Sequence, residues 1–275
     1  MRRSLRLLGK TGNTVLGLSC ALAVLLPILW IVSAAVRPNS DITAFPPTLI
    51  PRELTFENFI EVFERLPFAR LYGNTLAFAG IATAVSLTLD TLAGYALARL
   101  PFRGSNVILG MIVVLLMLPF QVTLVPLYEL MQKLDLVGTL PGLILPRITS
   151  AFGIFFMRQF FLSLPADLED AGRIDGASEW RIFRSLMLPL SRPALLTLGL
   201  FHFQAYWNDL IWPLIMSNRL ENATLPAGLA MFAGQATIEY SLTMAGSLLA
   251  LTPLVVVFLL VQRTFVQSIA TTGGK

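Results

Sequence analysis

The chain has 275 residues, of which 55% are hydrophobic and only 13% are charged, against roughly 25% charged residues in ordinary globular domains. Its mean hydropathy is +0.73. A soluble fold of this size could not bury so much apolar surface, so the composition argues against a soluble enzyme or a disordered chain and favours a protein surrounded by lipid. The net charge is +4. Because the basic residues form no dense run after the N-terminus, we attribute this charge to membrane topology and expect no nucleic-acid partner.

The sequence offers few residues that could bind a metal or act as a catalytic nucleophile. It holds one cysteine, Cys20, and one histidine, His202, so neither a disulfide framework nor a cysteine- or histidine-paired metal site can form within one chain. Residues 4–11 are one substitution away from a phosphate loop, but Ser4 replaces the first glycine and no strand is predicted before it. We therefore predict no catalytic residue, no metal and no cofactor in this chain.

Six apolar stretches are long enough to cross a bilayer as helices, which takes about 20 residues. Because open strands cannot span lipid, we predict an all-α integral membrane protein with six transmembrane helices. The predicted spans are 14–36, 71–98, 104–128, 136–157, 193–218 and 240–262. The basic N-terminus resembles a signal peptide, but the uncharged run 11–36 exceeds the 7–15 apolar residues of such a peptide and five spans follow, so we expect it to be retained as the first helix.

The placement of lysine and arginine predicts that both termini lie in the cytoplasm. With the N-terminus inside, thirteen basic residues fall on the cytoplasmic side and seven fall outside or within spans. The cytoplasmic stretches are then 1–13, 160–192 and 263–275, and the extracytoplasmic loops are 37–70 and 219–239. Short connections join the second span to the third and the third to the fourth.

The longest cytoplasmic loop, 160–192, carries the most informative local sequence. Pro165 suits the first position of a helix, where its missing N–H costs nothing. Acidic residues then occupy the opening turns, where negative charge meets the positive end of the helix; these are Asp167, Glu169 and Asp170. Asp175-Gly176 predicts a break, because glycine tolerates left-handed angles and aspartate can cap the next helix.

A second short helix should follow the break, with its apolar and basic residues on different faces. The apolar face holds Trp180, Phe183 and Met187, and the basic face holds Arg181 and Arg184. Pro189 should end this helix, and Pro193 can begin the fifth span. The residues alone leave two interpretations open, namely an amphipathic helix pair that lies on the lipid surface and a docking element for a partner protein.

In this loop the sequence resembles the permease subunits of binding-protein-dependent ABC importers. Asp170-Ala171-Gly172 stands where that family has Glu-Ala-Ala, Asp175-Gly176-Ala177 matches its usual Asp-Gly-Ala, and Leu186, Leu188 and Pro189 match the end of the motif. The departures are aspartate for glutamate at 170 and glycine for alanine at 172.

Flanking segments resemble the carbohydrate-uptake branch of the family and its maltose-type second permease subunit. They are Leu54–Phe59, Asn74-Thr75, Ala93–Arg99 with Phe102-Arg103-Gly104, and Trp207-Asn208-Asp209 with Trp212-Pro213-Leu214. The C-terminal tail, 268–275, is shorter than the family's usual ending. The resemblance implies one permease domain at about 70–265, in a bacterial or archaeal inner membrane.

The resemblance further implies a division of labour among subunits. The permease pairs with a second permease subunit, two cytoplasmic ATPase subunits bind ATP and Mg²⁺, and an extracytoplasmic binding protein delivers the solute. The loop 160–192 would be the coupling loop that receives the push of the ATPase. Its contact residues would be Glu169, Asp170, Ala171, Gly172, Asp175, Gly176, Ala177, Phe183 and Pro189. The expected solute is a sugar or a sugar-like molecule, namely an oligosaccharide, a polyol or glycerol phosphate.

Polar side chains within spans are costly and usually face a cavity or a partner. The candidates for the solute pathway are Gln204, Trp207, Asn208 and Asp209. A helix-packing or pairing role for Asp209 competes with solute contact, and Trp207 is equally suited to packing. Asp90 is ambiguous between structure and function. Arg147 beside Pro146 indicates a break in the fourth span, and Pro119 and Pro126 should kink the third.

Two other functions compete with an importer permease. A self-contained secondary transporter or channel would carry paired, interrupted half-repeats in many folds, and we find none. An intramembrane enzyme would need a nucleophile with its base or a metal centre, and the sequence offers neither.

Overall fold

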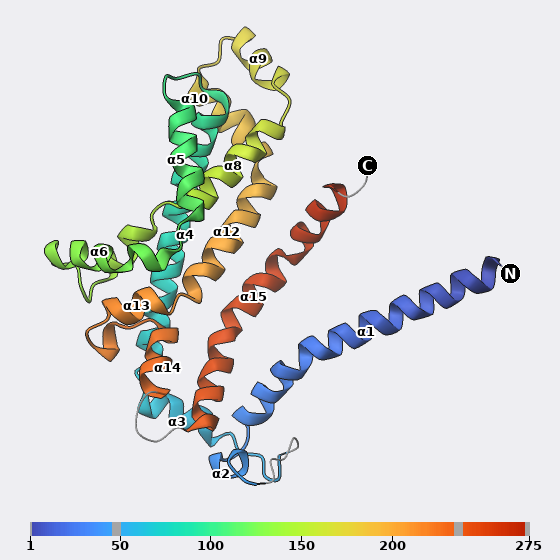
Figure 1. The fold of residues 1–275 in the computed structure, drawn as a ribbon, viewed down its shortest axis with the longest axis vertical. Coiled ribbons are helices and arrows are strands. Elements are labelled where there is room, and N and C mark those ends of the chain that lie inside the picture. Colours follow the sequence, from blue (N-terminus) through green and yellow to red (C-terminus); the bar gives the residue numbers. More distant parts are fainter. Residues whose placement is uncertain (1, 46–50, 234–238, 273–275) are drawn as a thin grey trace. The chain divides into compact units, whose positions relative to one another are not determined.

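The computed structural model describes residues 2–45, 51–233 and 239–272, with the side chains of 2–13 and 260–272 excluded. Every regular element among these residues is helical (Figure 1). The chain forms two compact units, one made of 1–68 with 229–252 and the other of 69–228 with 253–275. Residues Gly273-Gly274-Lys275 of the predicted cytoplasmic tail lie outside the described residues.

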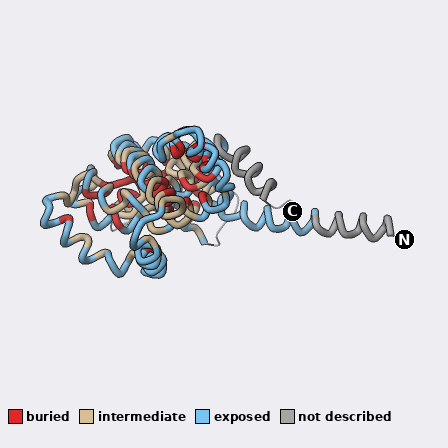
Figure 2. Tube along the Cα trace, turned by 90° about the horizontal axis from the view of Figure 1, so that it is seen from above, coloured by how far each residue is buried: buried red, intermediate tan, exposed pale blue. Residues whose placement is uncertain are grey.

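The first unit contains α1 (Arg2–Ala35), α2 (Asn39–Ile42), α3 (Glu57–Arg65) and the beginning of α15 (Tyr240–Thr272). Almost every side chain of 14–30 in α1 is exposed although most are apolar (Figure 2), as expected of a helix that lipid would cover. The amide of Asn58 in α3 donates to the carbonyls of Ala35 and Arg37, each at 2.9 Å. These bonds fix α3 against the end of α1.

The second unit is built around α4 (Phe68–Arg99), an unbroken helix that contains the whole second predicted span. The elements that follow are α5 (Ser105–Met117), α6 (Phe120–Lys133), α7 (Leu140–Ile144), η1 (Leu145–Arg147), α8 (Ala151–Ser163), α9 (Asp167–Ile174), α10 (Glu179–Ile182), η2 (Phe183–Met187), α11 (Leu188–Leu190), α12 (Arg192–Trp207), α13 (Ile211–Met216) and η3 (Leu220–Asn222). The helix α14 (Leu225–Ala233) runs on from this unit into the other.

Two clusters of buried side chains are present among the described residues of the second unit. One gathers Phe78, Met131, Trp207 and Trp212 with their neighbours, and the other gathers Tyr95, Met157, Phe161 and Phe183. A Cβ at Gly94 would lie 2.7 Å from the Cβ of Met157 and 2.9 Å from the backbone nitrogen of Arg158. This position must therefore be glycine for α4 and α8 to approach so closely.

Three predicted spans are less regular than expected. The third divides into α5 and α6, which meet at an angle of 103° across Leu118 and Pro119, so the expected kink at Pro119 is a sharp turn. Pro126 lies inside α6. The fourth span bends by 43° between Arg147 and Ala151, where Arg147 beside Pro146 indicated a break.

The fifth predicted span, 193–218, is not one helix. The helix α12 ends at Trp207, Asn208 occupies its C-cap, and a second helix begins only at Ile211. Asp209 therefore lies in a helix break, whereas the sequence placed it on the same helix as His202 and Gln204. Within the described part of the chain, three helices are long and apolar enough to cross a membrane. The number rises to six if each of three bent pairs counts as one span, namely α5 with α6, Leu140–Arg147 with α8, and Glu179–Leu190 with α12.

Candidate functional site

The loop 160–192 folds as two short helices separated by a sharp bend. Gly176 at the bend has φ of 76°, and its amide donates to the carbonyl of Arg173 at 3.0 Å, so the predicted left-handed break is present. The residue that caps α10 differs from the prediction. The Ser178 hydroxyl accepts from the amide of Arg181, whereas Asp175 is the C-cap of α9.

The helix α9 has one face against the protein and one face outward. Glu169 and Gly172 are buried, and a Cβ on Gly172 would lie 3.1 Å from Cγ1 of Ile182. Outward lie Asp167, Asp170 and Ala171, together with Leu168 and Ile174. Ile174 is 86% exposed. Pro165 lies two residues before α9 and not at its first position.

Arg99 fastens the buried face of α9 to the bundle. Its guanidinium donates to the carbonyls of Phe161 and Leu164, at 2.6 and 2.5 Å, at the C-terminal end of α8. Its Nε lies 3.4 Å from a carboxylate oxygen of Glu169, and both side chains are almost fully buried. Buried charged groups are costly to separate, so α4, α8 and α9 are held as one piece at this point.

An exposed ion-pair network braces the bend on the other side. The Arg173 guanidinium donates a hydrogen bond of 2.9 Å to Asp170. Two of its nitrogens also donate to the carboxylate of Glu179 beyond the bend, at 2.8 and 3.2 Å. The hydrogen bond from Arg173 holds the pKa of Glu179 below its ordinary value, and the same bond raises the pKa of Arg173. Since both groups are exposed, salt should weaken this brace.

Replacing Arg173 by alanine should loosen the bend without unfolding the protein. Because the folded pKa of Glu179 is lowered, the contribution of the brace is complete at pH 7 and falls as the pH drops through the carboxylate range. We expect lower protection of amides 176–179 in hydrogen exchange for R173A at pH 7, and we expect acid to reduce protection in the wild type more than in R173A. Equal protection in both proteins at pH 7 in low salt would contradict the brace.

The segment after the bend packs into the bundle in part as predicted, but the helix continues past Pro189 to Leu190. Phe183 and Met187 are buried with Tyr95 and Phe161, and the ring centroids of Tyr95 and Phe183 lie 4.8 Å apart. Trp180 touches Phe183 but is 61% exposed. It lines an apolar cavity of about 300 Å³ together with residues of α4 and Leu195 of α12.

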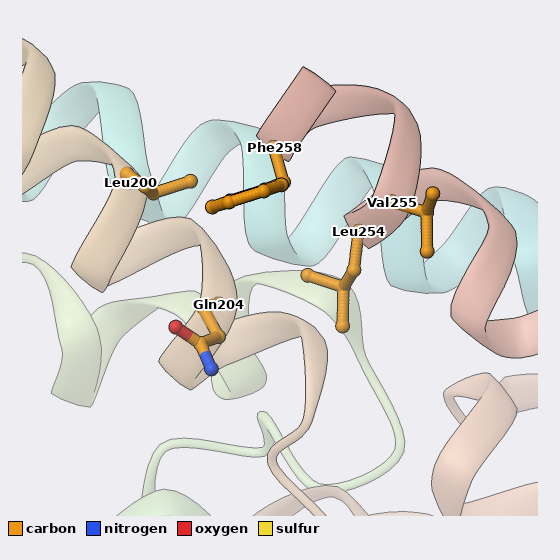
Figure 3. A pocket seen from close by; sticks show the side chains of 5 residues that line it. All are labelled: Leu200, Gln204, Leu254, Val255 and Phe258. Atoms are coloured by element: carbon orange, nitrogen blue, oxygen red, sulfur yellow. The ribbon is translucent and has the colours of Figure 1, made fainter. Parts of the chain in front are cut away.

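The four pathway candidates separate into different environments. Gln204 lines a cavity of about 250 Å³ between α12 and the later part of α15. Figure 3 shows the ring of Phe258 extending toward Leu200, whereas the Gln204 amide points away from the apolar side chains that line the cavity with it. Trp207 is buried against Tyr72 and Phe203, and Asn208 is exposed.

Asp209 is paired and does not face an open cavity alone. Its Oδ2 accepts a hydrogen bond of 2.6 Å from the guanidinium of Arg147, and the two side chains are 12% and 19% exposed. The ion pair is the contact that the pairing interpretation of Asp209 requires. The sequence indicated a break in the fourth span at Arg147, but it did not indicate that Arg147 would form an ion pair with Asp209.

Asp90 lies at the centre of a buried polar cluster. Its carboxylate accepts from the Thr149 hydroxyl at 2.7 Å and from the amide and hydroxyl of Ser150 at 3.0 and 3.2 Å. The Nε2 of His202 lies 3.0 Å from Oδ2. The cluster ties α4 to the N-terminus of α8 and to α12, which indicates a structural role. No group of three or more potential metal-ligating side chains occurs within the described part of the chain.

A comparison with known families identifies the chain. The sequence profile of the family described as "Binding-protein-dependent transport system inner membrane component" matches residues 90–271. The chain belongs to this family. The matched segment includes α9, the bend at Gly176 and both broken helices that carry Arg147 and Asp209.

Curated relatives of this permease cover almost its whole length. It is 36% identical over 258 residues to the arabinooligosaccharides transport system permease protein AraQ of Halalkalibacterium halodurans, covering 93% of this chain and 92% of the relative. It is 34% identical over 255 residues to the trehalose transport system permease protein SugB of Mycobacterium tuberculosis, covering 91% and 92%. It is 35% identical over 265 residues to the sn-glycerol-3-phosphate transport system permease protein UgpE of Escherichia coli O1:K1, covering 94% of each.

A solved structure shares the fold. A chain of a bacterial ABC transporter involved in the import of the acidic polysaccharide alginate superimposes on this permease with a TM-score of 0.81 and 26% sequence identity. The match covers 96% of this chain and 98% of the other. The resemblance noted from the loop and its flanking motifs is thus confirmed at the level of the family and the fold.

Proposed function

We propose that this chain is the membrane-spanning permease subunit of an ATP-driven importer that takes up a sugar or a sugar-like solute by alternating access. ATP hydrolysis would take place in two partner ATPase subunits, and a second permease subunit would complete the membrane part. An extracytoplasmic binding protein would deliver the solute. The termini would lie in the cytoplasm, and the spans and loops would follow the six-span topology predicted from the sequence.

The outward face of α9 is the observation that carries this proposal. It is a short helix with an exposed apolar tip at Ile174 and an acidic surface at Asp167 and Asp170. It is also fastened to α4 and α8 through Arg99 and Glu169. A helix so exposed and so firmly held can transmit a push from a partner protein into the bundle. We assign ATPase contact to Asp170, Ala171 and the bend at Gly176, and we assign Glu169, Gly172 and Phe183 to holding the loop on the permease.

For the solute pathway we favour the break after α12. Gln204 and Asn208 present amides that can hydrogen-bond a hydroxyl-rich solute, and Gln204 lines a cavity. We assign Trp207 and Asp209 to packing and pairing, and the buried environment of Trp207 and the ion pair of Asp209 support this assignment. The curated relatives are named for arabinooligosaccharides, trehalose and glycerol 3-phosphate, and these are the solutes to try first.

The proposal predicts a complex and an energy requirement. A tag on this chain should co-purify an ATPase and a second permease from the native membrane, and the reconstituted complex should accumulate one of the three trial solutes only with ATP and its binding protein. Accumulation by this chain alone in vesicles would instead identify a self-contained secondary transporter and overturn the proposal.

A further inference from the structure

Three helix breaks of the second unit meet at one ion pair. Phe120 begins α6 directly after the break at Leu118 and Pro119, Arg147 ends η1 just before the break at 148–150, and Asp209 lies in the break between α12 and α13. The Arg147 guanidinium carbon lies 4.0 Å from the centre of the Phe120 ring. The same guanidinium bonds Asp209 at 2.6 Å. We call Phe120, Arg147 and Asp209 the junction.

The surrounding backbone groups are satisfied by side chains from neighbouring elements. The Tyr206 hydroxyl donates to the carbonyl of Arg147 at 3.1 Å, and the Trp212 indole donates to the carbonyl of Leu143 at 3.3 Å. The amide of Trp212 donates to the second oxygen of Asp209 at 3.4 Å. Broken backbone at membrane depth persists only where protein or a water-filled cavity satisfies it, so these bonds make the junction a defined part of the fold.

The break at 148–150 is held from both sides. Before the break Arg147 is held by Asp209, and after it Thr149 and Ser150 are held by the buried Asp90 on α4. The Nε of Arg147 is buried and has no hydrogen-bond partner among the described residues. The end of η1 is therefore joined to the break before α13 by the ion pair with Asp209 and to α6 by the ring of Phe120, in addition to the Trp212 bond that holds α7.

A series of contacts along α4 connects the junction with the loop 160–192. The Tyr206 hydroxyl lies 3.4 Å from the hydroxyl of Ser86 on α4, and Ser86 precedes Arg99 by about 20 Å along an α-helix that rises 1.5 Å per residue. Arg99 holds α9, and Asp90 between them holds α8 and α12. A displacement of α9 thus reaches the junction through an unbroken helix.

We propose that the Arg147–Asp209 ion pair is a lock that holds the three broken helices in one arrangement and is released during each transport cycle. Arg147 acts as a positioning residue that touches no solute. Its planar guanidinium can pair with the carboxylate and stack on the Phe120 ring together, which a lysine ammonium cannot do. This inference rests on the proposed function, because the release is driven by the partner ATPases.

Two single variants and their combination test the lock. R147Q and D209N each leave one charge without its partner, which destabilises a largely buried site, so each should lower the amount of assembled complex. R147Q/D209N leaves no unpaired charge and should recover assembly. The pair Arg70–Glu221, with both side chains 59% exposed, offers the matched control R70Q. This control should change neither the amount of assembled complex nor the labelling rate described below.

The readout is the accessibility of the break in the absence of any solute. Cys20, the only cysteine in the sequence, is replaced by serine, and a cysteine is introduced by L210C in the break that also holds Asp209. The complex, purified through a tag on this chain, is labelled with a hydrophilic maleimide with and without ATP and vanadate. In the parent complex we expect ATP to change the labelling rate by at least about threefold, as a population shift between two arrangements.

The double variant gives the decisive result. A lock predicts that R147Q/D209N assembles like the parent but labels at the same rate with and without ATP. An ion pair that only stabilises the fold predicts normal assembly together with the full response to ATP, and that result would overturn the inference. An unchanged labelling rate in the parent complex would also overturn it. If no ATPase co-purifies with the parent chain, the proposed function fails, and this failure is distinct from a failure of the lock.

Discussion

Valine in place of Gly176 should lower ATP-driven uptake by at least tenfold, to about the background level, while the chain still inserts into the membrane. Gly176 has φ of 76°, and a Cβ there would meet no atom within 4 Å. The substitution therefore acts through the backbone alone. A β-branched residue strongly disfavours this region, at a cost of about 1–2 kcal/mol. Because the residues around the bend are exposed, the bend should relax and shift its own surface away from the partner, while Arg99 and Glu169 still hold α9.

Asparagine at the same position provides the matched control. Asparagine adopts left-handed angles more readily than other non-glycine residues, so G176N should keep most of the uptake. The measurements are uptake of whichever trial solute the wild type accumulates and the amount of ATPase retained on the tagged permease. Normal uptake by G176V, with the ATPase fully retained, would refute the coupling role of the bend.

Alanine in place of Gly153 should have the largest effect on stability. A Cβ at this position would overlap Oδ2 of the buried Asp90 and would lie 2.9 Å from Nε2 of His202. The carboxylate would have to leave the donors supplied by Thr149 and Ser150 and its contact with His202. Disrupting a buried charged network of this kind costs about 3–5 kcal/mol, so the unfolding temperature and the amount of assembled permease should both fall strongly.

Gly80 on α4 offers the comparison. A Cβ there would meet no atom within 4 Å, and alanine is favoured over glycine in a helix by about 1 kcal/mol. G80A should therefore unfold at the wild-type temperature or slightly above it, as measured by thermal unfolding in detergent. If G153A and G80A unfolded at the same temperature, the Asp90 cluster would contribute little to the fold.

The local features of the 160–192 loop could be predicted because they depend on residues close together in sequence. Gly176 permits the bend, the acidic residues of the first turn suit α9, and the apolar spacing placed Phe183 and Met187 in the core. The prediction that Asp175 caps α10 was wrong because Asp175 and Ser178 are both good capping residues. Which of them caps depends on where the chain resumes its helix after the bend.

The polar partners within the bundle could not be predicted, because each pair lies far apart in sequence. Arg147 and Asp209 are 62 residues apart, and Asp90 and His202 are 112 residues apart. Hydrophobicity marks each of these residues as unusual in a span but does not say which other helix will face it. Arg99 looked like a topology signal at the end of a span, although it holds α8 and α9 together.

The sequence by itself determined that this chain is helical, apolar enough for lipid, and a member of the importer permease family. These properties could be read from the sequence because composition and helix signals depend on residues close together in the chain, and because the family motif is a contiguous stretch. The sequence also indicated the breaks at Pro119 and beside Arg147, but only the tertiary structure decided that a further break lies at 208–210 and that Arg147 contacts both Phe120 and Asp209 at these breaks. The physical reason is that a helix can end within a bundle only where side chains from other helices satisfy its free backbone groups and charges, and the folded arrangement alone brings those side chains together.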